Sequence, residues 1–232
     1  MIDRLEASTK SIQDFSSDIS HELKTPLAII RGEVDLALRK SRTPEELIKT
    51  LQTVGEEVNE LIRLVDDLML LVRSDSRQLR FEKKRISLKE IINLMASRYQ
   101  DRAASRGLTI RTDIAADLFI QGDDIYIKRL FSNLIDNAIK FTPTGGMIDL
   151  ELKKFGNRAV AGVKDTGIGI ELDIQAKVFS RFFRSDSARS HEGAGLGLNI
   201  AKAICSGHSA EISIVSAPYK GTLVSVSFPI LS

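Results

Sequence analysis

The sequence predicts an all-α helical hairpin followed by an α+β sandwich of two layers. Three observations predict this multidomain fold. Residues 3 to about 75 hold only two glycines and one internal turn signal, which is typical of two long helices. From about residue 85 onward, helical and strand patterns mix without strict strand–helix–strand alternation. The long helical pattern of the first half ends after residue 76. We therefore expect a helical domain at 1–76, a linker at 77–84 and a second domain at 85–232.

The turn of the hairpin lies at residues 42–46. Thr43 is a good N-cap, Pro44 suits the first helical position, and Glu46 completes a capping box with Thr43. We expect one helix to end near residue 40 and the next to begin at 44.

Both predicted helices carry apolar seams. In the second helix the seam alternates spacings of four and three, as in a coiled coil: Leu47, Leu51, Val54, Val58, Leu61, Val65, Leu68 and Val72. The first helix has a looser seam: Phe15, Ile19, Leu23, Ile30, Val34 and Leu38. Further apolar residues at 62, 70 and 71 widen the stripe beyond what one partner helix covers. These patterns predict a homodimer that forms a four-helix bundle through the N-terminal helices.

The second half predicts helices and strands in mixed order. Ser87 and Glu90 offer another capping box at the start of a helix. We expect helices at 88–104, 123–141 and 198–207, and strands at 108–112, 147–154, 158–164, 210–216 and 222–229.

Composition excludes several classes of protein. The net charge of +2 gives no case for binding nucleic acid. The single cysteine, Cys205, rules out a disulfide framework within the chain, fits a reducing compartment and is expected in the core. No apolar run approaches the roughly 18 residues of a membrane span, and the first residues lack a signal-peptide core.

The first chemical motif is Asn133, Asn137 and Lys140 on a predicted helix. Spacings of four and three place the three side chains on one face, with apolar residues opposite. Two carboxamides and an ammonium suit a triphosphate with its magnesium ion. The alternative is an ordinary solvated face.

The second motif follows an apolar strand and reads Asp165-Thr-Gly167-Ile-Gly169. A carboxylate at a strand end can accept a hydrogen bond from an adenine amino group, and glycines let the backbone approach the base. An ordinary Asp-x-Gly turn remains the alternative.

The third motif is Gly193-Ala-Gly195-Leu196-Gly197, which leads directly into a helix. Backbone amides at such a helix start can bind an anion. The spacing matches neither a dinucleotide fingerprint nor a P-loop, and a flexible loop is the alternative.

A histidine lies in the stretch SHELKTPL, residues 20–27. At 3.6 residues per turn, His21 is rotated by about 200° from Ile19 and therefore faces solvent. Thr25 shares its face, and Pro26 is expected to bend the helix. On its own His21 could be an incidental surface residue, whereas a downstream nucleotide site makes it a candidate nucleophile.

Together these stretches resemble the sequence boxes of histidine kinases. SHELKTPL resembles the H box of their dimerisation and phosphoacceptor domain. The other stretches resemble boxes of the ATP-binding domain: 133–141 the N box, 165–170 the G1 box, 179–184 the F box and 193–201 the G2 box. The resemblance runs from about residue 10 to the C-terminus. It implies the Bergerat (GHKL) sandwich, which gyrase-type ATPases and cytosolic chaperones share.

The resemblance also implies roles in holding ATP. Asn137 would be the Mg²⁺ ligand with Asn133 assisting, Lys140 would contact phosphate, and Asp165 would read adenine. The remaining nucleotide-binding residues would be Phe141, Gly167, Gly169, Phe182, Arg184, Gly193, Gly195, Leu196 and Gly197. Residues 185–192 are expected to form a mobile lid.

The implied function is ATP-dependent autophosphorylation of His21, followed by transfer to an aspartate of a response regulator receiver domain. Glu22 would take the Nδ1 proton, Lys24 would help electrostatically, and Thr25 would orient water for phosphatase activity toward the regulator. We expect the chain to be the cytoplasmic portion of an inner-membrane bacterial sensor, with any membrane contact through upstream segments.

Two departures from the family pattern occur. The glycine pair after the histidine of the last helix is replaced by Ser209 and Ala210, and a later turn reads Tyr219-Lys-Gly-Thr222. Both are expected to lie away from the nucleotide site. Two other functions compete. A gyrase-like ATPase would carry glutamate where Asn133 stands, and a pseudokinase scaffold would lack the intact boxes.

Overall fold

The computed structural model describes residues 2–39, 42–76, 78–183 and 194–231. The chain divides into two compact units, one ending at Val72 and the other beginning at Arg73. The N-terminal unit is helical. The C-terminal unit contains a five-stranded sheet with helices. The predicted combination of a helical hairpin with an α+β sandwich is confirmed.

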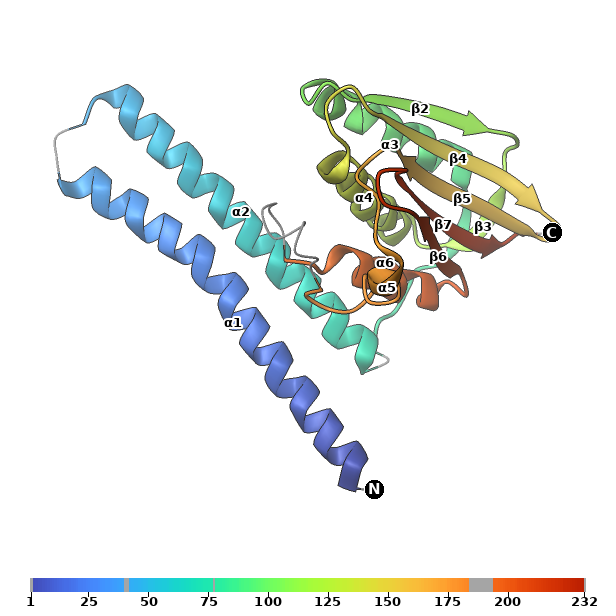
Figure 1. Ribbon diagram of the computed structural model, residues 1–232, viewed down its shortest axis with the longest axis horizontal. Helices are drawn as coiled ribbons and strands as arrows, with labels where there is room; N and C mark the ends of the chain where they lie inside the picture. Colours follow the sequence, from blue (N-terminus) through green and yellow to red (C-terminus); the bar gives the residue numbers. More distant parts are fainter. Residues whose placement is uncertain (1, 40–41, 77, 184–193, 232) are drawn as a thin grey trace. The chain divides into compact units, whose positions relative to one another are not determined.

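The hairpin consists of α1 (Ile2–Arg39) and α2 (Pro44–Asp75), shown in Figure 1. Its predicted capping box is confirmed. The Thr43 amide donates to Glu46 Oε2 at 3.0 Å, and the Glu46 amide donates to Thr43 Oγ1 at 3.3 Å. Helix α1 continues through Pro26. Within the described ranges, no helix is long and apolar enough to cross a membrane.

Large apolar side chains stay exposed along both helices of the single chain. The exposed residues are Leu27, Ile29, Val34, Leu36, Leu38, Leu47, Ile48, Leu51, Val58, Ile62, Val65, Met69 and Val72. Five of the eight residues of the predicted α2 seam are among them. One copy of the hairpin therefore leaves much of its apolar surface uncovered.

The main sheet of the C-terminal unit has the strand order β2-β4-β5-β7-β6. Its strands are β2 (Thr109–Ile114), β4 (Met147–Phe155), β5 (Arg158–Asp165), β6 (Glu211–Ser216) and β7 (Thr222–Pro229). Strands β2 and β4 are parallel, and the other neighbours are antiparallel. Helices α3 (Leu88–Ala104), α4 (Asp124–Phe141) and α6 (Gly197–Gly207) cover one face (Figure 1).

Three short elements were not predicted. Strands β1 (Lys84–Ser87) and β3 (Phe119–Gly122) form a separate antiparallel pair, and α5 (Leu172–Gln175) is a single turn. Each has four residues, which is too short to show a period. Ser87 also caps α3, because its Oγ accepts the Glu90 amide at 3.1 Å.

The start of α4 is held by Asp123 and a buried histidine. Asp123 Oδ1 accepts the amides of Ile125 and Tyr126 at 3.1 and 3.4 Å. His208, 4% exposed, accepts the Asp123 amide at Nε2 and lies 2.8 Å from the Ile204 carbonyl oxygen at Nδ1. Burial lowers the pKa of His208, which favours the neutral ring. The ring therefore fixes α4 against the end of α6.

Cys205 lies within the last helix, and Ser209 follows its end. Cys205 is buried as predicted, and burial raises the pKa of its thiol to about 12. Ser209 adopts a left-handed conformation with φ of 54°. That conformation favours glycine, so the chain carries local backbone strain where the family pattern has a glycine.

Candidate functional site

The predicted polar face of α4 is present. Asn133, Asn137 and Lys140 are half-buried, whereas the apolar side chains on the opposite face are fully buried: Leu134, Ile135, Ala138 and Ile139. The Asn133 Nδ2 atom is buried and has no hydrogen-bond partner in the described part of the chain. A buried amide without a partner costs stability, so this atom is a candidate ligand contact.

The start of α6 lies beside this polar face. A Cβ atom added to Gly197 would lie 3.7–3.9 Å from side-chain atoms of Asn133. Leu196, the N-cap residue, is buried and anchors the helix start. The predicted entry of the glycine motif into a helix is confirmed. The first amides of α6 and the Asn133 carboxamide of α4 therefore line the same region.

Asp165 ends β5 and is only 8% exposed. Its Oδ1 accepts two backbone amides, from Gly167 at 2.8 Å and from Thr222 at 3.2 Å. Within the described residues, no group donates to Oδ2. Burial raises the pKa of the Asp165 carboxyl, and the two hydrogen bonds offset part of that rise. The carboxylate is thus held in one orientation with one oxygen left as an acceptor.

The turn Tyr219-Lys-Gly-Thr222, one of the two departures from the family pattern, was predicted to lie away from this site. That prediction is wrong. Thr222 donates to Asp165, and the Tyr219 amide donates to the Ile168 carbonyl oxygen at 2.7 Å. The reason is the register of the sheet, which pairs Asp165 with Thr222 across β5 and β7. The turn before β7 therefore forms one wall of the site.

Glycine is required at two positions of the loop after Asp165. A Cβ atom on Gly167 would lie 2.4 Å from the Phe141 carbonyl oxygen. At Gly169, with φ of 69°, a Cβ atom would lie 1.9 Å from the Ala217 carbonyl oxygen. Both obstacles are backbone atoms, so neither can be moved by a side-chain rotation. The glycines let this loop pack against the end of α4 and the β6–β7 turn.

We predict that Gly169→Ala destabilises the C-terminal unit by roughly 3–5 kcal/mol, because left-handed strain adds to a backbone clash. Gly156→Ala is the matched control. Gly156 also has a positive φ, of 57°, but a Cβ atom there would meet nothing within 4 Å. The control should cost about 1–2 kcal/mol. Urea unfolding of both variants measures the difference, and equal losses would contradict the proposed close packing.

The third motif is described only in part. Gly195 has φ of 69° and packs against the backbone of Phe182 and Phe183. Asn199 of α6 donates to the Phe179 carbonyl oxygen at 2.8 Å, which joins the helix to the 179–183 segment. Phe182 itself is half-buried. Arg184, Gly193 and the predicted lid at 185–192 lie outside the described residues.

His21 lies on α1 and is exposed, as predicted from its rotation away from Ile19. Glu22 is half-buried, and Thr25 is exposed on the same face as His21. These three residues belong to the N-terminal unit, whereas the nucleotide-site candidates belong to the C-terminal unit.

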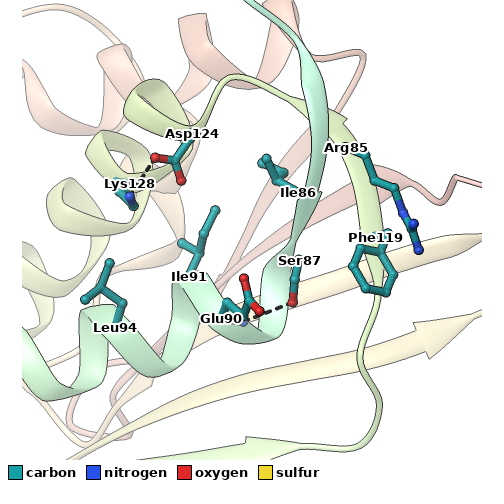
Figure 2. A pocket seen from close by; sticks show the side chains of 9 residues that line it. All are labelled: Arg85, Ile86, Ser87, Glu90, Ile91, Leu94, Phe119, Asp124 and Lys128. Atoms are coloured by element: carbon teal, nitrogen blue, oxygen red, sulfur yellow. Dashed lines mark hydrogen bonds and ion pairs between the residues drawn. The ribbon is translucent and has the colours of Figure 1, made fainter.

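A separate hollow lies between β1, α3 and α4 (Figure 2). Three of its charged side chains make contacts within it. Lys128 pairs with Asp124 at 2.6 Å, and the Arg85 guanidinium stacks over the Phe119 ring at 4.0 Å. None of the predicted site residues line it. The hollow is therefore distinct from the polar region around Asn133.

Comparisons with known proteins place this arrangement in a family. The model of the His Kinase A (phospho-acceptor) domain matches residues 11–77. The model of the Histidine kinase-, DNA gyrase B-, and HSP90-like ATPase family matches residues 122–232. The chain belongs to the histidine kinases. The kinase BaeS of Escherichia coli K12, named a signal transduction histidine-protein kinase, is 32% identical over 97% of this chain and 48% of its own length.

Solved histidine kinases share the fold. The Acinetobacter baumannii histidine kinase AdeS has a TM-score of 0.76 at 22% identity, with 91% of this chain and 98% of that chain covered. The histidine kinase ThkA, solved with the response regulator protein TrrA, has a TM-score of 0.74 at 22% identity. The match covers 97% of this chain and 64% of that chain. The chain spans about half the length of the curated kinases that it matches.

Proposed function

We propose that the chain uses ATP to phosphorylate His21 and passes the phosphoryl group to an aspartate of a response regulator. One observation carries the proposal. The polar face of α4, with the unpaired Asn133 amide, lies against the glycine start of α6 and within the same unit as the Asp165 carboxylate. Acceptors for a base and donors for phosphates are the features a purine triphosphate requires.

The residues present fit ATP with Mg²⁺. We assign Asn137 as the metal ligand, assisted by Asn133, and Lys140 as a phosphate contact. Asp165 Oδ2 would accept the adenine amino group. We assign the remaining nucleotide contacts to Phe141, Gly167, Gly169, Phe182, Gly195, Leu196 and Gly197. Arg184 and Gly193, which lie outside the described residues, stay predicted contacts. When bound, Mg²⁺ supplies positive charge that neutralises the phosphate oxygens.

In the first chemical step, His21 Nε2 attacks the terminal phosphorus of ATP. A nitrogen–phosphorus bond forms, the bond to the bridging oxygen breaks, and ADP leaves. The ring gains positive charge, so its Nδ1 proton needs an acceptor, and Glu22 is next in the chain. Lys24 adds positive charge near the transferring group. Positioning and charge neutralisation supply most of the rate enhancement.

We assign residues 1–76 to dimerisation and phosphotransfer, 77–84 to a linker and 85–232 to ATP binding. The exposed apolar residues of α1 and α2 support a homodimer, because a second hairpin would cover them in a four-helix bundle. The match to the phospho-acceptor domain model supports the same assignment.

We predict that Leu51→Glu dissociates the dimer. Leu51 is 68% exposed in the single chain, and a carboxylate at this seam position would be buried without a partner in the bundle. The matched control is Leu94→Glu on α3, where the leucine is 50% exposed in the ATP-binding unit. Sedimentation equilibrium should show a dimer for the control and a monomer for Leu51→Glu. A dimer in both would exclude this seam as the interface.

The partner would be a response regulator receiver domain. ThkA, solved in complex with the response regulator TrrA, supports this class of partner. We further propose that Thr25 orients a water molecule to hydrolyse the phosphorylated regulator, since it shares the exposed face of His21. That the chain is the cytoplasmic portion of an inner-membrane sensor stays a prediction.

Incubation with ATP labelled at the γ-phosphate tests the proposal against its two rivals. Acid-labile, base-stable label on the chain supports a kinase. Released phosphate without label supports a gyrase-like ATPase. Neither label nor released phosphate supports a scaffold and rejects the proposed function.

A further inference from the structure

Three neighbouring strands carry a row of polar residues beside the proposed base site. Asp165 of β5 pairs with Thr222 of β7, and Thr222 pairs with Ser216 of β6. Residues paired across antiparallel strands project to the same face of the sheet. Asp165, Thr222 and Ser216 therefore lie side by side, with Ser216 farthest from the carboxylate.

The hydroxyl of Ser216 has three polar neighbours. Its Oγ accepts the Ile170 amide at 2.9 Å, donates to the Gly221 carbonyl oxygen at 2.9 Å and lies 2.8 Å from Thr222 Oγ1. A serine hydroxyl has one proton and two acceptor positions. The proton is used by Gly221, because a carbonyl oxygen cannot donate. Thr222 must therefore donate its own hydroxyl proton to Ser216.

This arrangement determines whether the groups beside the proposed base site donate or accept hydrogen bonds. With its proton directed to Ser216, the Thr222 hydroxyl can only accept hydrogen bonds from other groups. Asp165 Oδ2 is also an acceptor, and Oδ1 is held by the Thr222 amide. Adenine carries an amino donor at its 6-position, whereas guanine carries a carbonyl acceptor there. Two acceptors, Asp165 Oδ2 and the Thr222 hydroxyl oxygen, therefore favour the amino group of adenine over the carbonyl group of guanine.

We infer that Ser216 is a positioning residue that sets base specificity, acting through Thr222 and without touching the nucleotide. The inference deepens the proposed function and rests on it, because it requires that Asp165 reads the base. Removing the Ser216 hydroxyl frees the Thr222 proton to rotate toward the base, where it could serve guanine as a donor.

The test measures dissociation constants of Mg-ATP and Mg-GTP for the full chain by calorimetry. Ser216→Ala should lower the preference for ATP over GTP about tenfold, the value of roughly one net hydrogen bond. Ser216→Thr keeps a hydroxyl at the position and should restore the preference. In autophosphorylation, Ser216→Ala should raise KM for ATP and leave kcat unchanged.

Gln175→Ala is the matched control for loosening of the loop. Gln175 Nε2 donates to the Ile170 and Ser216 carbonyl oxygens at 2.9 and 2.8 Å, so it ties the same segments together without contacting the Thr222 hydroxyl. This variant should weaken ATP and GTP binding in proportion. An equal loss of preference in Gln175→Ala and Ser216→Ala would overturn the inference.

The Thr222→Val variant tests the same inference, and it can be measured even if Ser216→Ala does not fold. It should lower the preference by itself, and Ser216→Ala should add nothing in its background. An unchanged preference in Thr222→Val, or a further loss in the double variant, would overturn the inference. A wild-type chain that binds no ATP would instead reject the proposed function as well.

Discussion

His21→Ala is expected to abolish phosphorylation of the chain while nucleotide binding stays within twofold of wild type. The nucleophilic nitrogen is lost, whereas every proposed nucleotide contact belongs to the other unit. The side chain is exposed, so its removal leaves no cavity. Labelling with γ-phosphate-labelled ATP and calorimetry with a non-hydrolysable analogue measure the two quantities separately.

Ser20→Ala is the control for this variant. Ser20 is the adjacent exposed nucleophile, and its hydroxyl donates only to the helix backbone, to the Ser16 carbonyl oxygen at 2.8 Å. The control should retain full labelling. Label that persists in His21→Ala and disappears in Ser20→Ala would move the acceptor to the serine and refute the proposed chemistry.

Asn137→Ala is expected to lower kcat/KM for autophosphorylation by roughly a hundredfold, because a proposed Mg²⁺ ligand is lost where phosphate charge must be neutralised. The fold should be preserved, since the apolar face of α4 that packs in the core is unchanged. The loss should be partly reversed at high Mg²⁺ concentration, which a purely structural defect would not show.

Asn157→Ala makes the same chemical change at an exposed position in the turn between β4 and β5. It should leave kcat/KM and its dependence on Mg²⁺ unaltered. Wild-type activity in Asn137→Ala, measured across a Mg²⁺ titration, would remove Asn137 from the metal site.

The parts of the fold that local chemistry determines could be predicted from the sequence. The starts of α2 and α3 follow from the residues that satisfy their first amides, Thr43 with Glu46 and Ser87 with Glu90. The buried face of α4 follows from helical spacing alone.

The parts that depend on distant pairing could not be predicted. Strand β1 exists because Lys84–Ser87 pairs with Phe119–Gly122, and neither segment shows strand alternation by itself. The contact between Thr222 and Asp165 joins residues 57 positions apart and depends on the register of β5 and β7. The role inferred for Ser216 likewise requires the order of three strands, which only the fold supplies.

The central claim is that a nucleotide held by the C-terminal unit phosphorylates the imidazole of His21. Mass spectrometry of the wild-type chain after incubation with Mg-ATP, under conditions that preserve nitrogen–phosphorus bonds, tests it most directly. The account predicts a single phosphoryl group on the peptide that contains His21. Unmodified His21 in protein that calorimetry shows to be saturated with ATP would contradict it.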